Sequence, residues 1–402
     1  MTKSQEKKYI AIVFLVLMCV QLIPIEGYGV SNVKFAAMIA APFIWLNSFK
    51  TFSKAFVWGG IYLLVIVFSV IYNSDSFRLS TVGYKIAFIV MFIMYYDLIY
   101  YKRALTLLDF IKILRTLILA YFICLVVQQL AIMLGVRSLP IINLMYYLDR
   151  DIGSNSLALE PSHAARILTV LMLILLRMHE VKWGSSNLIF SRLYKENKWI
   201  ILGFLWSMLT MGSGTALVGL AILSLYFLKQ QYIIVVSFVF LVFYLSIPFI
   251  NYEPFNRAKI TFEASLMLDQ KEVKEADYSA AGRIVPLLNT FTKLDITNED
   301  TWFGKGIDTN NSADYLSEGQ TIGGITDYGL IPFIISLIFV FVCCIRKPLS
   351  LETLIFILML GLTVGNIAYT WGVLMLFTTS KYFTTNKRLH QQIISIKASK
   401  LI

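Results

Sequence analysis

Three ionisable residues are concentrated at the start of one apolar segment in the middle of the chain. Glu160, His163 and Arg166 follow one another at i, i+3 and i+6. At about 100° per residue they fall within a ~120° arc of one helix, and Pro161 suits the first helical turn. A carboxylate or an imidazole can accept a proton from a hydroxyl, and a guanidinium can hold a phosphate. The segment is therefore the first candidate for a catalytic site. The alternative is a buried ion pair between Glu160 and Arg166 that holds helices in register.

A second candidate group follows in the long polar stretch of the C-terminal half. Arg283 offers a planar fork for phosphate oxygens, and the glycines of Gly304-Lys305-Gly306 let backbone approach a bulky ligand. This turn lacks the GxxxxGK[ST] spacing of a phosphate-binding loop, so a plain surface turn is the alternative interpretation. Further candidates for substrate contacts are Lys34, Arg78, Arg257 and Tyr278. Each of these, and Lys85 with them, is on its own more typical of a structural or solvated residue.

The sequence predicts no metal site and no cofactor. Residues 308–319 alternate acidic and polar side chains as a calcium loop does. However, Ala313 stands where such a loop needs its central glycine, and Gly319 stands where it needs its last carboxylate. The four cysteines all lie in apolar segments and form no CxxC pair, so neither a metal knuckle nor a disulfide framework is indicated.

The composition identifies the elements that must position these residues. Apolar residues make up 58% of the 402-residue chain and charged residues only 15%, against about 45–50% and about 25% in soluble proteins. A soluble enzyme and a disordered chain are both excluded. The formal net charge of +11 fits cationic residues beside membrane spans, which set orientation, better than nucleic-acid binding.

We therefore expect an all-α integral membrane protein with about twelve transmembrane helices, each close to the ~20 apolar residues that a bilayer requires. The predicted spans are 9–25, 30–46, 55–72, 80–101, 116–135, 157–177, 199–211, 215–229, 232–250, 328–345, 351–366 and 367–381.

The orientation depends on the short pair of spans around residues 199–229. The glycines of Gly212-Ser213-Gly214 suit a tight turn, whereas one long helix across 199–228 would invert everything after it. Inversion would place Arg346, Lys347 and the basic tail outside, against the positive-inside rule. We therefore predict a hairpin and cytoplasmic termini. Residues 1–250 then hold nine spans, 251–327 form a large, partly helical external loop, and 328–402 hold three spans and a basic cytoplasmic tail.

Four features resemble the bacterial O-antigen and capsule repeat-unit polymerases, which are related to the O-antigen ligases. They are EPSHAA at 160–165, the LTMGSGTALVGL hairpin at 209–220, the Gly-Arg pair ending at Arg283 with GKGI some twenty residues on, and DYGLIPFI at 327–334. Each motif is short, and their order carries more weight than any one of them. The hairpin departs from the family by having Gly214 where many relatives have arginine.

The resemblance implies a metal-independent glycosyltransferase of GT-C type in the cytoplasmic (inner) membrane, with its site facing the periplasm or exterior. It would transfer a growing glycan from undecaprenyl diphosphate to the non-reducing end of another lipid-linked repeat unit, for lipopolysaccharide or capsule. Its partners would be that lipid-linked oligosaccharide, the bilayer and a chain-length regulator protein, and no nucleic acid. Arg283 and Arg166 would stabilise the departing diphosphate, assisted by Lys34 or Arg78, and Glu160 or His163 would be the base.

Three other functions remain open on the sequence. An O-antigen ligase is disfavoured because no histidine occurs between 180 and 389, where ligases carry a histidine in the large loop. A transporter of lipid-linked oligosaccharide would move substrate without forming bonds, and no repeat symmetry between the halves is visible. A scaffold subunit of an envelope-assembly complex would tolerate charge substitutions at Glu160 and Arg283.

Overall fold

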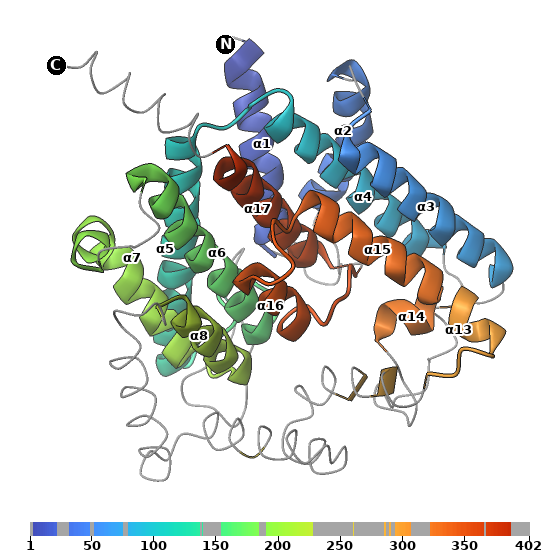
Figure 1. Ribbon diagram of the computed structural model, residues 1–402. Coiled ribbons are helices and arrows are strands. Elements are labelled where there is room, and N and C mark those ends of the chain that lie inside the picture. The colour runs from blue at the N-terminus through green and yellow to red at the C-terminus, as the bar shows by residue number, and fades with distance from the viewer. Residues whose placement is uncertain are drawn as a thin grey trace.

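The computed structural model describes residues 3–21, 32–48, 52–74, 79–136, 139, 154–184, 190–227, 260, 285–286, 289–290, 294–306, 322–365 and 367–386. Regular structure within these ranges is helical, and no strand occurs in them (Figure 1). The predicted span 232–250 and most of the loop 251–327 lie outside the described residues.

The helices bear out the all-α prediction for the part of the chain described. Their bounds are α1 Lys3–Cys19, α2 Asn32–Ser48, α3 Lys54–Tyr72, α4 Leu79–Tyr100, α5 Leu107–Met133, α6 Pro161–Trp183, α7 Phe190–Thr210, α8 Gly214–Phe227, α13 Glu299–Phe303, α14 Gly323–Tyr328, α15 Leu330–Cys343, α16 Leu351–Leu358 and α17 Ala368–Thr385.

Three of these helices are long and apolar enough to cross a membrane. They are α3, α4 from Ser80 and α5, and shorter apolar helices of 10–17 residues lie within α2, α8 and α15. Many large apolar side chains on them face outward, among them Leu64, Ile71 and Met133 at 69–75% exposure. Apolar side chains on the outer surface suit a lipid environment, and together with these three helices they are compatible with a membrane protein.

Contacts between helix termini define two ends of the bundle. At one end Arg115 of α5 and His179 of α6 both meet Asn197 near the start of α7. At the other end Gln128, far along α5, bonds Ser156 just before α6. Helices α5, α6 and α7 therefore alternate in direction. We refer to these two ends as the Trp183 end and the Glu160 end of α6.

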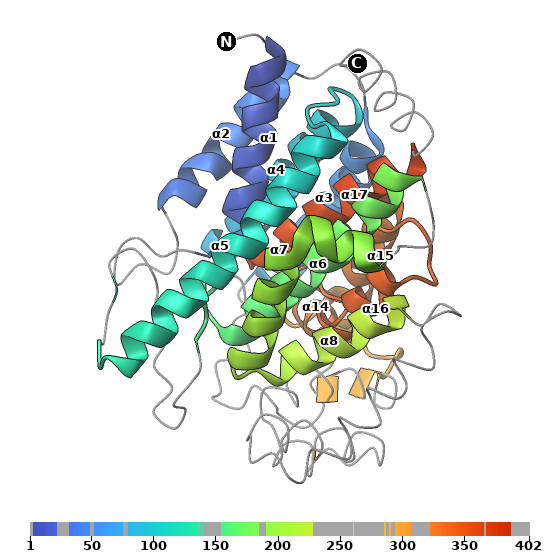
Figure 2. The ribbon, with the colours of Figure 1, turned by 90° about the vertical axis from the view of Figure 1, so that its left-hand side faces the viewer.

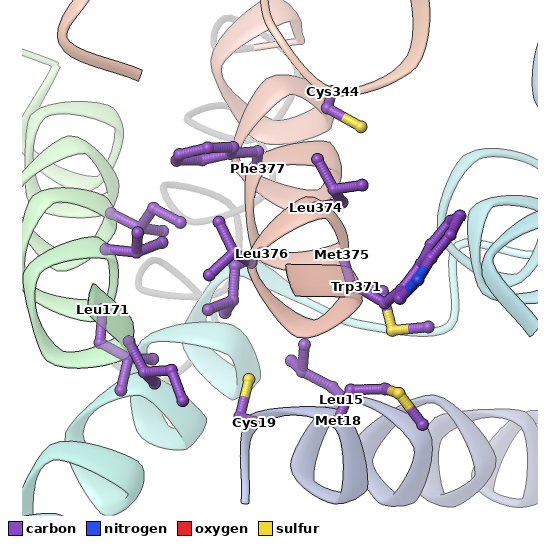
Figure 3. Close-up of a cluster of buried hydrophobic side chains, with 14 of the residues drawn as sticks. Leu15, Met18, Cys19, Leu171, Cys344, Trp371, Leu374, Met375, Leu376 and Phe377 are labelled. Atoms are coloured by element: carbon purple, nitrogen blue, oxygen red, sulfur yellow. The ribbon is translucent and has the colours of Figure 1, made fainter. Parts of the chain in front are cut away.

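Helix α17 forms the centre of the bundle. In Figure 1 it lies between α15 and α6, and it packs against α6, α1 and α4; Figure 2 shows it behind α5 to α7. Its side chains point toward Leu15 and Met18 of α1 and toward Leu171 of α6 (Figure 3). Gly372 allows the close approach, because a Cβ there would lie 2.9 Å from the Met18 backbone. Its buried threonines Thr378 and Thr379 donate to the backbone carbonyls of Cys343 and Met375, so they do not oppose burial of the helix.

The predicted hairpin near residue 212 is confirmed. Helices α7 and α8 are separate, and Gly212 in the turn between them has a φ of 70°. Thr210, at the end of α7, accepts a hydrogen bond from Gln129 of α5 at 2.8 Å. The opposite end of α8 bonds α6 through Tyr226 and Glu180 at 2.6 Å. The two helices therefore run antiparallel, as the positive-inside argument requires.

The prediction of a continuous span over 351–366 is wrong. Helix α16 ends at Leu358, and the backbone from 359 to 365 is irregular. Gly361 has a φ of 62° and donates its N–H to the Ile357 carbonyl, and Leu362, with a φ of 57°, donates to the Phe356 carbonyl. A left-handed glycine that donates to the carbonyl four residues before it ends a helix in the αL motif. The segment 359–365 is thus an irregular stretch between α16 and α17.

Candidate functional site at the start of α6

Glu160 occupies the position immediately before α6. Its backbone is extended, with φ −136° and ψ 152°, and Pro161 is the first helical residue. The Glu160 carbonyl accepts the N–H groups of His163 and Ala164 at 3.1 and 3.2 Å. Proline fits here because its missing N–H would have no partner inside the helix. Pro161 therefore sits in the first turn, as predicted, whereas Glu160 caps the helix from outside it.

A buried polar network fixes the chain that leads into α6. Ser154, Asn155 and Ser156 are at most 1% exposed. The Ser156 N–H donates to Gln128 Oε1 at 2.6 Å, and its hydroxyl donates to the Tyr121 carbonyl at 2.5 Å. Because buried polar groups are costly unless they are hydrogen-bonded, these contacts hold the entry to α6 rigidly against α5.

Glu160 and His163 form the acid–base part of the site. Glu160 Oε2 lies 3.8 Å from His163 Nε2, and the Ser162 hydroxyl donates to the same carboxylate oxygen at 3.3 Å. The Glu160 side chain is 50% exposed and that of His163 13%. The His163 ring packs on the Tyr369 ring, with centroids 4.4 Å apart. A carboxylate open to solvent and a mostly buried imidazole are thus within reach of one incoming hydroxyl.

Arg166 is buried and meets the same tyrosine. One terminal nitrogen donates to the Tyr369 hydroxyl, and the guanidinium carbon lies 5.5 Å from the centre of that ring. Its Nε has no hydrogen-bond partner among the described residues, and no described carboxylate lies within 4 Å of the group. The alternative of a Glu160–Arg166 ion pair is therefore not formed. Instead, Tyr369 links His163 to Arg166.

Tyr369 is the residue that sequence reasoning missed. It is the second residue of α17 and is 3% exposed. In sequence it is one aromatic residue within an apolar span, and nothing in its spacing from residues 160–166 connects it to them. The fold alone brings Tyr369 to His163 and Arg166, because it places the start of α17 beside the start of α6.

Lys85, treated above as structural or solvated, lies buried in α4 at 2% exposure. Its ammonium group donates to the Val364 carbonyl in the irregular segment 359–365, and it lies 5.5 and 5.3 Å from the ring centres of Tyr62 and Tyr328. No carboxylate of the described part of the chain is within 4 Å of it. A second buried cation thus contacts the segment that leads directly to Tyr369.

Asp327 is the acidic group whose charge acts on Lys85. It belongs to the short helix α14, before the apolar helix α15 begins. Burial raises the pKa of the Asp327 carboxyl from 3.8 to about 6, and the Lys85 charge lowers it in part. The carboxyl therefore changes charge in the range of mildly acidic pH.

The Gly304-Lys305-Gly306 turn packs against the DYG motif. The Lys305 and Gly306 N–H groups donate to the carbonyls of Thr326 and Asp327 at 2.9 and 3.2 Å. A Cβ on Gly304 would lie 2.6 Å from the Asp327 carbonyl oxygen, and one on Gly329 only 2.1 Å from that of Trp302. The space beside Gly304 is thus filled by the backbone of Asp327 and Tyr328, and the binding of substrate by Gly304, Lys305 and Gly306 stays a prediction.

The turn is also attached to the end of α3. The Ser69 hydroxyl and the Asn73 amide both donate to the Phe303 carbonyl, at 2.7 and 3.0 Å. Lys305 is exposed beside this anchor. Two predicted motifs therefore meet each other, next to Lys85, but no described contact joins the turn to Glu160.

The remaining predicted site residues are not part of this cluster. Lys34 is buried in α2 at 8% exposure, and no described contact joins it to Glu160, His163 or Arg166. The candidates outside the described residues are Arg78, Arg257, Tyr278 and Arg283.

The site can hold an anion and accept a proton. Among the described residues no three histidine, cysteine or carboxylate side chains come together as metal ligands. Searches against protein-family models, curated proteins and solved structures find no match to this chain.

Proposed function

We propose that the protein is a polymerase of lipid-linked polysaccharide repeat units. It would transfer the growing glycan from undecaprenyl diphosphate to the non-reducing end of another undecaprenyl-diphosphate-linked unit, on the outer face of the cytoplasmic membrane. The proposal rests on one observation above the others. A buried guanidinium with no carboxylate within 4 Å among the described residues lies, through Tyr369, next to the Glu160–His163 pair.

The bond changes define what the site must do. The anomeric carbon of the donor glycan breaks its bond to the diphosphate oxygen and forms a bond to the acceptor hydroxyl oxygen. The electron pair of the broken bond stays on the diphosphate, and the hydroxyl proton passes to Glu160 or His163. The elongated glycan remains on the acceptor's lipid, and undecaprenyl diphosphate leaves.

Arg166 suits the developing negative charge on the diphosphate. A fixed guanidinium in a site of low dielectric stabilises such charge strongly, since it needs no reorientation during the reaction. Its Nε, which lacks an acceptor among the described residues, can donate to a phosphate oxygen. Lys85 would add a second cation from α4, and Arg283 keeps its predicted role on the external loop.

Glu160 and His163 remain alternatives for the base. Glu160 is the more accessible to an incoming sugar, because half of its side chain is exposed. His163 is held in place by the Tyr369 ring. Replacing each by the neutral glutamine, Glu160→Gln and His163→Gln, separates them, because only the loss of the base removes the proton acceptor for the hydroxyl.

The test is reconstitution of the purified protein with a purified undecaprenyl-diphosphate-linked repeat unit, with the products resolved by size. We expect a ladder of polymers that persists in EDTA and disappears in Arg283→Ala. No ladder from folded protein and verified substrate would contradict the proposal, and an assay of transbilayer movement would then examine the transporter alternative. A ladder of unchanged length distribution in Arg283→Ala would contradict the role of that residue.

A further inference from the structure

The Trp183 end of α6 carries a cationic cluster that the proposed reaction does not use. It is built around Glu196 of α7, whose carboxylate lies 2.7 Å from Lys182, 3.6 Å from Arg192 and 3.8 Å from Arg115. The buried His179 lies 4.0 Å from the same carboxylate. One carboxylate faces three permanent cations, so the cluster keeps a positive charge.

Asn197 holds this cluster in a fixed shape. It interrupts α7 with φ −135° and ψ 24°, and it is only 2% exposed. Its side-chain oxygen accepts from Arg115 Nε at 2.7 Å, and its amide nitrogen donates to the Leu193 carbonyl at 3.1 Å and lies 3.1 Å from His179 Nε2. The first part of α7 is thereby fixed on α5 and α6.

The outer face of this part of α7 is cationic and aromatic. Lys195 and Lys198 are exposed, and neither has a carboxylate within 4 Å in the ranges that the structure covers. Arg192 is 57% exposed and lies 4.7 Å over the Trp183 ring. Trp199 is 71% exposed, with the Lys198 ammonium 5.5 Å from its ring centre.

We infer that Arg192, Lys195, Lys198 and Trp199 bind the phosphate headgroup of an anionic phospholipid in the leaflet at the Trp183 end. An anionic ligand fits by charge, because Arg192, Lys195 and Lys198 point outward. Among the described carboxylates, only Glu196 lies within 4 Å of any of them. Tryptophan is typical of the headgroup level of a bilayer, and lysine reaches that level along its apolar stem. The inference concerns the opposite end of α6 from the proposed reaction and does not depend on it.

The test is native mass spectrometry of the full chain in detergent, titrated with phosphatidylglycerol or with phosphatidylcholine of the same acyl chains. The variant is Lys195→Gln/Lys198→Gln, which removes two exposed charges. The matched control is Arg346→Gln/Lys347→Gln, which removes two exposed charges between α15 and α16. A third arm adds inorganic phosphate at matched ionic strength.

We expect phosphatidylglycerol to bind more tightly than phosphatidylcholine. Each cation near an anionic headgroup contributes about fivefold, so the variant should lose about 30-fold in affinity for phosphatidylglycerol, while the control keeps the wild-type affinity. An equal loss of phosphatidylglycerol affinity in both double variants would overturn the proposed site. Equal affinity of the wild-type protein for the two lipids would overturn it as well. Displacement of phosphatidylglycerol by inorganic phosphate would overturn the assignment to lipid in favour of a soluble anion.

Discussion

Two arginines of α6, about three helical turns apart, differ in their charged partners. Arg177 forms ion pairs with Glu180 and Glu352, both at 3.3 Å, and lies 5.3 Å over the Tyr226 ring. Arg166 also lies over a tyrosine, but that tyrosine's hydroxyl is its only described hydrogen-bond acceptor. Within the described part of the chain, the same residue type on the same helix thus has two carboxylate partners at one end and none at the other.

The difference separates a structural role from a functional one. A buried charge with carboxylate partners holds helices together, and removing one partner of such a set is strongly destabilising. A buried charge without a counter-charge costs free energy, which a bound anionic ligand can repay. Arg177 accordingly joins α6 to α16, whereas Arg166 is the arginine that we propose to bind the substrate diphosphate.

The largest effect on stability should come from Arg177→Gln. This change leaves the Glu180 and Glu352 carboxylates without their shared cation, and we expect a loss of about 3–4 kcal/mol in the free energy of unfolding. Denaturant unfolding in detergent measures it. The exposed Arg192→Gln is the control, with an expected loss below about 1 kcal/mol. Equal losses of unfolding free energy in the two variants would contradict a structural role for the Arg177 ion pairs.

Asp327 provides a pH-dependent test next to Lys85. Because burial raises the folded-state pKa from 3.8 to about 6, the folded protein binds the proton more tightly than the unfolded chain. Wild-type stability should therefore fall as pH rises between these two values, by about 2–3 kcal/mol, and stay level above them. Asp327→Asn should remove this slope and be the more stable protein at neutral pH. A stability difference between the two proteins that does not change with pH would rule out the buried ionisation.

Tyr369→Phe tests whether the Tyr369 hydroxyl positions Arg166. The phenyl ring keeps its packing on His163 but loses the hydroxyl that accepts from Arg166, so the guanidinium is less well positioned. We expect the rate of polymerisation to fall about tenfold, because small errors in placement are costly in catalysis. The readout is the initial rate of ladder formation per folded molecule. An unchanged rate would show that Tyr369 does not position Arg166.

The smallest effect should be that of Arg166→Gln on stability. Removing a buried charge that has no carboxylate partner relieves a desolvation cost, so the free energy of unfolding should change by less than about 1 kcal/mol, or increase. The same unfolding experiment applies, with Arg177→Gln as the matched arginine. A loss as large as that of Arg177→Gln would make Arg166 a structural residue.

The helices themselves were largely predictable from the sequence. Apolar runs and flanking charges locate the helices, and Gly212 with the positive-inside rule gives the hairpin. The break after Leu358 was not predictable from hydropathy, since residues 354–362 are an uninterrupted run of apolar residues and glycine. A left-handed Gly361 ends the helix there, and a glycine inside an apolar run does not reveal its φ.

The site was predictable only in part, because its decisive contacts are long-range. Pro161 indicates where α6 begins, and the spacing from Glu160 brings His163 close. The partner of Arg166, however, lies more than two hundred residues away on α17. Similarly, Gly304 and Gly329 belong to motifs that look independent in sequence and become one packed turn only in the fold. Tertiary packing, rather than local pattern, decides both.

The most direct measurement compares Arg166→Gln with Arg177→Gln in proteoliposomes containing a purified undecaprenyl-diphosphate-linked repeat unit, with rates expressed per folded molecule. If Arg166 stabilises the departing diphosphate, its loss should slow polymerisation about 10²–10³-fold, and folded Arg177→Gln should retain the wild-type rate. A folded Arg166→Gln protein that extends the ladder at the wild-type rate would contradict the account.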